Sequence, residues 1–575
     1  MGAEQRRACR VATGCKRRQR LGRPNPHPNR GGGDQRGRAA RRVRLLPEAR
    51  ISAAKVLRMT RISFKIRIMA MYPSSPSNRR PTPDGASAAH NGTDGAVPGA
   101  ADSDVLLRLE TKTGRVQPRM PAAPERPLSA FFAELGADPL ASAFRGRQAV
   151  HPFVGLEPVL EDAVAGIWQR LCETPRSGPS VAYVHIPFCF NHCLYCGFYQ
   201  NAWHPEDGRA YVDRVIAQLR SGRDLPMQAE GSIRSLYFGG GTPTLLAAGD
   251  LARLIEAARL HLPLAPDCEI TVEGRVHGFG QDKADAAFDA GANRLSFGVQ
   301  TFDETVRRRM GRLSSRREVV AALEGLLRAD RGAVVIDLIF GLPGQNAAVW
   351  EADLQQAIAL GLDGIDLYAL KQVRETPLTR AVQAGRVVPA PPAHLGDFYR
   401  IGSECLRDAR WEALSCTHWR STTRERNLYN LSVKAGADCL AFGAGAGGST
   451  NGPDAGFSYR NIAAVQTYQA RIDAGEPVVA GLMRQSPHRR LFDSIKGGLE
   501  RGRLNTAAVA AQLQADTGLD WQALAEPLLV QWQQAGLLMR DGDWVELTLA
   551  GRFSQVQLTL NLQQWLSQAL THRQA

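Results

Sequence analysis

The sequence predicts an α/β protein whose centre is a partial, open, parallel β/α barrel of about six units. Short apolar or β-branched runs alternate with longer helical segments between about residues 180 and 370, a pattern typical of βα units and a parallel sheet. The 575 residues are enough to bury the core of a catalytic barrel. Composition changes towards both ends, which separates this centre from an N-terminal leader and a small C-terminal domain.

Residues 1–125 are predicted to be a disordered basic leader and linker. Residues 1–70 carry 20 Lys and Arg against three acids, whereas the other 505 residues carry 51 basic and 53 acidic side chains. The formal charge of +15 therefore belongs to the leader, which lacks apolar periodicity. It suits a nucleic-acid arm, a transit-type peptide, or an untranslated stretch before a start at Met69, Met71 or Met120; the last interpretation is favoured. Residues 72–104 have a linker composition.

Residues 126–470 are predicted to hold a helical lead-in followed by the barrel. A helix is expected from Val159 to Leu171, after Glu157-Pro158. The predicted strands are Val181–Ile186, Ile233–Phe238, Glu269–Val272, Arg294–Val299, Val334–Phe340 and Ile365–Leu370. Amphipathic helices are expected between them, for example at Arg209–Arg220, Leu251–Leu260 and Glu318–Ala329. Six units indicate a barrel open on one side instead of a closed eight-unit barrel.

Residues 471–575 are predicted to form a helical, winged-helix-like domain. Leu537–Met539 and Trp544–Leu549 flank Asp541-Gly542, which is a hairpin signal. A DNA-binding function is disfavoured, because residues 481–575 hold nine Lys and Arg against eight acids and so lack a basic footprint. A packing or lid domain, and no nucleic-acid partner, are expected instead.

The chain has no uncharged apolar run long enough to span a bilayer. Its ten cysteines are sparse, and three of them crowd into eight residues. This clustering suggests a metal site in a reducing cytoplasm and argues against a disulfide framework.

The three clustered cysteines are Cys189, Cys193 and Cys196, in the stretch Tyr183-Val-His-Ile-Pro-Phe-Cys-Phe-Asn-His-Cys-Leu-Tyr-Cys. Thiolates at these spacings can hold three irons of a cubane iron–sulfur cluster. No fourth cysteine lies nearby, so one iron would keep an open position. The alternative is a zinc site of three cysteines with His185 or His192, which is disfavoured because structural zinc sites usually bring two ligand pairs from separate loops.

This motif resembles that of the radical S-adenosyl-L-methionine (SAM) superfamily, in particular the branch of oxygen-independent coproporphyrinogen III oxidase and the radical SAM heme chaperones. The likeness runs from about residue 180 to 450 and does not include residues 1–125. It implies a [4Fe-4S] cluster held by the three cysteines, and two SAM molecules. A reduced cluster is then expected to split SAM into methionine and a 5′-deoxyadenosyl radical.

Other motifs lie at the carboxyl ends of predicted strands, where α/β barrels build their sites. The glycines of Gly239-Gly-Gly-Thr-Pro-Thr allow a close backbone approach, and a carboxylate such as Glu273 accepts hydrogen bonds from an ammonium or ribose. By resemblance, Tyr183, Glu273 and the three cysteines match the first SAM site. The second SAM site is matched by Tyr195, Gly240, Gly241, Thr242, Gln300, Arg312, Asp337 and Ala369. Ordinary structural roles stay open for four of these features. The glycine motif can be a simple turn, Glu273 a surface acid, Gln300 a strand-end amide and Asp337 a partnered core acid.

Three members of the branch compete. Phe198 stands where the oxidase usually has a further cysteine, and Gly197-Phe198 where the chaperones usually have Asp-Phe. The segments Gly197-Phe-Tyr-Gln-Asn201 and Thr271-Val-Glu-Gly-Arg275 look like those of the heme-utilisation radical SAM methyltransferases (ChuW/HutW type). This resemblance, the first choice, implies anaerobic opening of heme to a linear tetrapyrrole with iron release. The expected partners are heme or a related porphyrin and a flavodoxin, ferredoxin or NADPH-linked reductase.

The sequence says less about heme contacts. His418 and Tyr429 are candidates for an iron or propionate contact, although a histidine beside a tryptophan is more often a packed residue. The loop Gly443–Gly448 offers close approach to a flat ligand, and a Rossmann function is excluded because no suitable strand–turn–helix surrounds it. Arg424, Arg426 and Arg460 are candidates for propionate pairing, with solvated arginines as the default.

Overall fold

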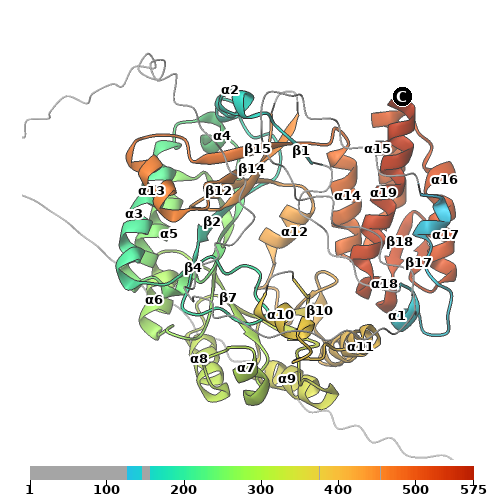
Figure 1. Ribbon diagram of the computed structural model, residues 1–575, viewed down its shortest axis with the longest axis horizontal. Coiled ribbons are helices and arrows are strands. Elements are labelled where there is room, and N and C mark those ends of the chain that lie inside the picture. Colours follow the sequence, from blue (N-terminus) through green and yellow to red (C-terminus); the bar gives the residue numbers. More distant parts are fainter. Residues whose placement is uncertain (1–125, 145–155, 374–375, 453–454, 575) are drawn as a thin grey trace, which may run out of the picture. The chain divides into compact units, whose positions relative to one another are not determined.

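The computed structural model describes residues 126–144, 156–373, 376–452 and 455–574 (Figure 1). The predicted leader and linker, residues 1–125, lie outside the described residues. The described chain contains a 13-stranded mixed sheet, a 3-stranded sheet and a 2-stranded sheet. In this part of the chain, no helix combines the length and apolar character that crossing a bilayer requires.

The six predicted strands are confirmed, and they lie side by side in chain order. They are β2 (Ser180–Ile186), β5 (Ile233–Gly240), β6 (Leu264–Gly274), β7 (Arg294–Gln300), β8 (Ala333–Phe340) and β9 (Gly364–Ala369). Each pairs in parallel with the next. A seventh parallel strand that the sequence reading missed, β12 (Asp438–Phe442), pairs with β2. The partial barrel is open, because its two outermost strands are paired with further strands and not with one another.

Antiparallel strands extend the sheet on both sides. Beyond β12 lie β13 (Gly447–Asn451), β14 (Gly456–Asn461), β15 (Val479–Gln485) and β1 (Leu156–Pro158). Beyond β9 lie β11 (His418–Arg420) and β10 (Glu412–Ala413). The 2-stranded sheet consists of β3 (Phe188–Cys189) and β4 (Asn201–Ala202), which bracket the cysteine loop.

Helices connect the parallel strands and lie around the outside of the sheet (Figure 1). The longer ones are α3 (Pro205–Ser221), α5 (Ala248–His261), α6 (Gln281–Asp289), α8 (Arg316–Ala329) and α9 (Ala347–Leu360). Short ones are α4 (Pro226–Ala229), η4 (Pro243–Leu245) and α7 (Glu304–Arg309). Helix α8 begins with a capping box, in which Ser315 and Glu318 satisfy each other's backbone N–H groups. Local signals of this kind explain why the helices match the predicted segments.

The remaining helices precede the sheet or follow β9. The lead-in contains η3 (Leu128–Phe131), α1 (Pro139–Ser142) and α2 (Glu161–Cys172), the last of which was expected. After β9 come α10 (Pro377–Gln383), α11 (Pro392–Asp408), α12 (Leu428–Lys434) and α13 (Val465–Asp473). Helix α12 packs against β2 and β5, so part of the chain after the barrel returns to the sheet.

The C-terminal domain combines helices with the predicted hairpin, β17 (Leu538–Asp541) and β18 (Trp544–Leu547), which β16 (Arg503–Asn505) completes. Its helices are α14 (Arg489–Glu500), α15 (Thr506–Thr517), α16 (Trp521–Leu524), α17 (Glu526–Gln534), α18 (Leu549–Phe553) and α19 (Gln555–Gln574). Strand β15 falls inside the predicted range 471–575 but belongs to the large sheet. We therefore propose that this domain begins after residue 485.

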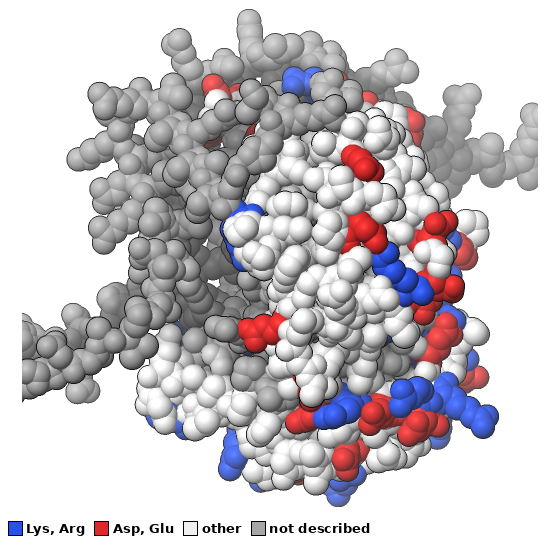
Figure 2. All heavy atoms as spheres, turned by 90° about the vertical axis from the view of Figure 1, so that its right-hand side faces the viewer, with Lys and Arg blue, Asp and Glu red and all other residues white. Residues whose placement is uncertain are grey.

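The surface of the C-terminal domain carries charges of both signs. Figure 2 shows Lys and Arg next to Asp and Glu on the described part of this face, without a continuous basic patch. Arg503 pairs with Glu546 at 2.9 Å and Arg540 pairs with Glu526 at 2.5 Å. Arginines already paired with carboxylates are poor phosphate contacts, and the packing or lid function of this domain stays a prediction.

Candidate active site

One face of the parallel sheet is apolar and the other is polar. Residues two apart in a strand point to the same face, and the register places Tyr183 opposite Tyr237 and Asp337 opposite Asp366. Gly239 confirms the juxtaposition, because a Cβ there would meet Glu273, Tyr237 and Tyr183 within about 3 Å. The alternate residues are buried and apolar: Ala182, Val184, Leu236, Phe238, Val272, Ile336, Leu338, Ile365 and Leu367. The apolar face packs in the core, so the polar face is the candidate site.

The cysteine loop leaves the carboxyl end of β2. The backbone N–H of Leu194 donates to Met310 O at 3.2 Å, and the Asn191 amide donates to Gly311 O at 2.7 Å. The Gly241 N–H donates to Ile186 O at 2.8 Å, at the start of the loop. The loop is thus held from two sides, by the turn after β5 and by the segment after α7.

Each buried thiol of the loop lies beside a cationic or hydroxyl group. The Cys189 sulfur is 3.7 Å from the Thr242 hydroxyl and 3.8 Å from the Arg275 guanidinium. The Cys193 sulfur lies 3.5 Å from Arg312. Burial raises the pKa of Cys189, although Arg275 and Thr242 oppose it. Burial would also raise the pKa of Cys193. The positive charges of Arg312 and Arg275 outweigh burial there, so the pKa of that thiol is lowered. Thiolates are the form that binds iron or zinc.

These residues fit an iron–sulfur cluster better than a single zinc ion. Among the described residues, no three His, Cys, Asp or Glu side chains surround one point as the ligands of one ion do. The His192 ring contacts Cys196 O at 3.0 Å and stacks on Tyr199, and the His185 ring contacts the Tyr183 hydroxyl at 2.8 Å. A cubane cluster is larger than one ion and takes its three ligands from separate corners, so three thiols spread along one loop suit it.

The turn after β5 requires its glycines. Gly240 has φ +116°, and a Cβ there would meet the His185 ring at 2.6 Å. At Gly241 a Cβ would meet Phe188 O at 2.3 Å, a contact that no side chain tolerates without moving the backbone. The glycines therefore allow the turn to lie directly against the cysteine loop, which brings Thr242 to the Cys189 thiol.

Glu273 lies at the carboxyl end of β6, on the polar face. Burial raises the pKa of its carboxyl to about 7, against the opposing hydrogen bonds of the Gly240 backbone and the Tyr237 hydroxyl. Near neutral pH this carboxyl therefore exists in both protonation states. It lies close to the Gly239–Gly241 turn, so the two motifs that the sequence singled out separately form one surface.

Gln300 ends β7 in a strained backbone conformation. Its φ of +67° is rare for a residue with a side chain, and the register with β8 shifts at this point. Its amide is buried, and the side-chain oxygen has no hydrogen-bond partner among the described residues. Arg312 is buried nearby and donates to Gly298 O, two residues before Gln300. Strain together with an unsatisfied amide is typical of a ligand site.

The remaining predicted residues lie around this surface. Burial raises the pKa of Asp337 well above its ordinary value, and the neighbouring Asp366 adds to the effect. Ala369 ends β9 and pairs with Phe340 of β8. Tyr195 packs against the small apolar group of Val306, Met310 and Leu342. The structure thus brings Asp337 onto the polar face, whereas Tyr195 belongs to the cysteine loop itself, between Cys193 and Cys196.

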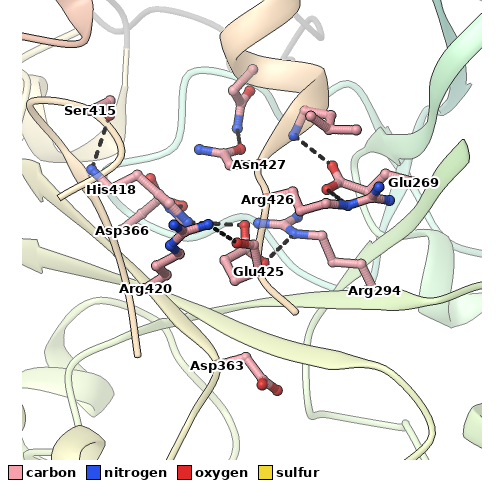
Figure 3. Close-up of polar contacts among 12 residues, drawn as sticks. Glu269, Arg294, Asp363, Asp366, Ser415, His418, Arg420, Glu425, Arg426 and Asn427 are labelled. Carbon is pink, nitrogen blue, oxygen red and sulfur yellow. Dashed lines mark hydrogen bonds and ion pairs between the residues drawn. The ribbon is translucent and has the colours of Figure 1, made fainter. Parts of the chain in front are cut away.

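A buried network of charges lies next to the polar face (Figure 3). The His418 ring contacts Asp366 at 2.9 Å and Glu425 at 3.0 Å, and Arg294 donates to Glu425 at 2.8 Å. Burial alone lowers the pKa of His418, but Asp366 and Glu425 raise it to about 9. At neutral pH the ring is therefore an imidazolium held between two carboxylates. It is a packed histidine in this structure, not an open iron ligand.

The other candidate heme contacts are also engaged elsewhere. Tyr429 stacks on Tyr237 with ring centroids 4.7 Å apart. Arg424 pairs with Asp330 at 2.7 Å, and Arg426 pairs with Asp267 at 3.5 Å. Two further candidates serve the backbone: Arg460 donates to Gly445 O, and Gly443, with φ +96°, lies against His185 O. The structure therefore assigns none of these groups to an open ligand surface.

Several residues at the site were not singled out from the sequence. Arg275 contacts the Cys189 thiol and follows Glu273 by two residues, so a positive charge at a strand end was an available signal. Tyr237 faces Tyr183 at the same level of the sheet, and strand alternation gives that position. Arg294, Asp366 and Glu425 meet only through the fold, because Arg294 and Glu425 are 131 residues apart.

Comparison with known proteins agrees with this geometry. The radical SAM superfamily profile matches residues 183–357. The anaerobilin synthase of Escherichia coli O157:H7 is 42% identical over 427 residues, which are 74% of this chain and 92% of that protein. The heme chaperone HemW of Synechocystis sp. is 30% identical over 345 residues, which are 58% of this chain and 80% of that protein.

A solved structure has the same fold. The coproporphyrinogen III oxidase (HemN) from Escherichia coli, a radical SAM enzyme, superposes with a TM-score of 0.60 at 21% identity, covering 73% of this chain and 96% of that chain. The predicted cysteine, glycine and carboxylate motifs fall within the range matched by the superfamily profile. The chain belongs to the radical SAM superfamily, in the coproporphyrinogen III oxidase-like branch, and within it to the heme-utilisation type that is represented by anaerobilin synthase.

Proposed function

We propose that this enzyme degrades heme without oxygen, by radical SAM methyltransferase chemistry that opens the porphyrin to a linear tetrapyrrole and releases iron. The observation that carries the proposal is the 42% identity to anaerobilin synthase over 92% of that protein. The superfamily implies a [4Fe-4S] cluster and SAM as cofactors.

Cys189, Cys193 and Cys196 would hold the cluster. When bound, a reduced cluster supplies the electron that cleaves SAM into methionine and a carbon radical. Arg275 and Arg312 lie within 4 Å of two of the thiols, so they offset the negative charge that the thiolates add to a buried loop. The third thiolate, Cys196, is stabilised by a hydrogen bond instead: the backbone N–H of Phe198 donates to its sulfur at 3.3 Å.

The enzyme would hold two SAM molecules. Glu273 and Tyr183 would bind the first, with the Glu273 carboxylate accepting from the ammonium group next to the glycine turn. Gln300, Arg312 and Asp337 would bind the second, together with Tyr195, Gly240, Gly241, Thr242 and Ala369. The unsatisfied Gln300 oxygen and the high pKa of Asp337 support this division, because both groups gain a partner when a polar, cationic ligand arrives.

The substrate would be heme or a related porphyrin, and a flavodoxin-like or NADPH-linked reductase would supply electrons. A cytoplasmic location would suit the unpaired cysteines. The heme chaperone function is the second candidate, because HemW proteins are similar over much of this chain. The coproporphyrinogen oxidase function is disfavoured, because the exposed Phe198 stands where that group usually has a further cysteine.

The test is an anaerobic reaction of the full-length protein, reconstituted with iron and sulfide, with heme, SAM and a strong reductant. Loss of the heme Soret band should depend on SAM, and mass spectrometry should find 5′-deoxyadenosine and a methylated linear tetrapyrrole. Cys193→Ala should abolish both. Heme that stays bound and intact would instead favour the chaperone function, and turnover of coproporphyrinogen alone would favour the oxidase.

A further inference from the structure

A continuous line of oxidisable side chains starts at the polar face. Tyr183, Tyr237 and Tyr429 form a stack, with ring centroids 6.3 Å apart for Tyr183–Tyr237, 6.0 Å for Tyr183–Tyr429 and 4.7 Å for Tyr237–Tyr429. Tyr183 and Tyr237 come from β2 and β5, and Tyr429 comes from α12, which packs against both strands.

The line continues to the outside of the sheet. The Tyr429 hydroxyl lies 3.9 Å from the Cys439 sulfur on β12. The Tyr459 hydroxyl donates to Cys439 O at 3.4 Å, and the Tyr459 ring meets the Trp168 ring at a centroid distance of 4.9 Å. Trp168 is half-buried on α2. We define Tyr183, Tyr237, Tyr429, Cys439, Tyr459 and Trp168 as the tyrosine chain.

Packing alone does not account for a tyrosine at position 429, in the middle of the chain. The Tyr429 hydroxyl has sulfur, a weak acceptor, as its contact. Burying a phenol with a poor partner costs free energy that phenylalanine would avoid. Burial also raises the pKa of Tyr183, Tyr237 and Tyr429 well above the ordinary value, so these phenols stay protonated. Tyrosine, tryptophan and cysteine are, however, the side chains that lose an electron most readily.

We propose that the tyrosine chain moves the radical position outward to Trp168, by passing an electron inward to the site, when the carbon radical forms without a porphyrin to react with. The inference rests on the proposed function, because that function places a carbon radical beside Tyr183. It assigns these residues a protective redox activity that the heme reaction itself does not need.

The chemistry balances as follows. The carbon radical takes the hydrogen atom of the Tyr183 hydroxyl, so a C–H bond forms and the O–H bond breaks. An electron passes along the stack from Trp168 to the phenoxyl oxygen. The phenolate so formed takes a proton from water, which reaches the half-buried Tyr183, and the His185 ring nitrogen lies 2.8 Å from its oxygen. The oxidised indole loses its N–H proton to water. It then regains an electron from a reduced flavin or iron–sulfur protein, the reductant class that the proposed function requires, and a proton from water.

The experiment mixes anaerobic, reconstituted full-length enzyme with SAM and reductant, without porphyrin. Freeze-quenched electron paramagnetic resonance (EPR) spectra should contain a tyrosyl signal that narrows when the protein is grown with ring-deuterated tyrosine. Trp168→Phe removes the surface side chain that donates the electron, so the tyrosyl signal should last several-fold longer. Tyr429→Phe interrupts the stack and should abolish the difference that Trp168→Phe makes.

A matched control distinguishes the chain from tyrosines in general. Tyr399 is buried, and its hydroxyl donates to Cys416 O at 2.7 Å, but it lies outside the chain. Tyr399→Phe should leave the signal unchanged. Circular dichroism and the iron content of each variant should match the wild type, which excludes misfolding.

Four results would overturn the inference. If 5′-deoxyadenosine forms but no tyrosyl signal appears, or if Trp168→Phe behaves like Tyr399→Phe, the chain does not conduct, although the proposed function stands. If Tyr429→Phe changes only the KM for heme, the stack is a substrate platform instead. If no 5′-deoxyadenosine forms at all, the proposed function fails, and the relay fails with it because there is no radical to remove.

Discussion

Replacing Glu425 with glutamine tests whether the buried charge network holds the barrel together. Glu425 is fully buried, and its carboxylate lies 2.8 Å from Arg294 and 3.0 Å from His418. Burial alone would raise the pKa of Glu425, but Arg294 and His418 lower it to about 2. Glutamine keeps the size of the side chain and removes the charge, so two buried cations lose their shared anion.

We expect Glu425→Gln to lower the free energy of unfolding by about 3–5 kcal/mol, the usual cost of breaking a buried ion pair from one side. The matched control is Glu412→Gln, whose carboxylate is 62% exposed and pairs with Arg420 at 2.7 Å. An exposed pair contributes about 0–1 kcal/mol. Both values can be measured by urea unfolding of the full-length protein under anaerobic conditions, with circular dichroism as the signal.

The pH dependence gives a second readout of the same network. The depressed pKa of Glu425 contributes stability that is present above about pH 4.5 and is lost as pH falls towards 2. The raised pKa of His418 contributes stability that is present below about pH 6.5 and is lost as pH rises through about 9. Glu425→Gln removes one of the anions that raise the pKa of His418, so the alkaline loss should shrink. A variant within 1 kcal/mol of wild type, with an unchanged pH profile, would refute this reasoning.

Three further outcomes follow from the site. Cys193→Ala should lose the iron–sulfur absorption band after reconstitution while circular dichroism stays unchanged; retention of the band would rule out this thiol as a ligand. Gly241→Ala should destabilise the cysteine loop by about 1–3 kcal/mol and lower iron uptake, since its Cβ would meet Phe188 O at 2.3 Å. Gly249→Ala, where a Cβ meets nothing within 4 Å, is the control, and an equal effect would disprove the clash. SAM should bind more tightly as pH rises through about 7, because the deprotonated Glu273 carboxylate accepts a hydrogen bond from the ammonium group of SAM. Calorimetry at several pH values should detect net proton release on binding. Binding that does not depend on pH would contradict this role of Glu273.

The sequence was sufficient for the strands of the barrel and for the cysteine loop. Each strand is a short run rich in apolar, β-branched or aromatic residues, a local pattern that can be recognised without knowledge of the fold. The seventh parallel strand, β12, was missed because Asp438–Phe442 is only 5 residues long and follows the short helix α12 outside the run of six predicted units. Strand β15 was also missed; it continues the large sheet although it lies in the segment assigned to the C-terminal domain.

The charge network was beyond sequence reasoning for a different physical cause. Arg294 starts β7, and Glu425 lies in the segment before α12, so their contact exists only after the chain has returned to the barrel. Periodicity identifies which side of a strand is buried, but it does not identify a partner 131 residues away. The strain at Gln300 is hidden for a similar reason, because a positive φ in a residue other than glycine is imposed by its surroundings.

Asp337 is a residue that the sequence singles out and whose surroundings only the structure reveals. An aspartate inside the apolar run Val334–Phe340 is costly unless something compensates it, so the sequence alone indicates a partnered acid or a ligand contact. In the structure its strand neighbour is another acid, Asp366, and His418 lies on the far side of that residue. The carboxyl of Asp337 therefore faces the polar surface with no ion pair to a cation among the described residues, and its raised pKa follows from burial and from the neighbouring Asp366. A cationic ligand such as SAM would bring a positive charge next to this carboxyl.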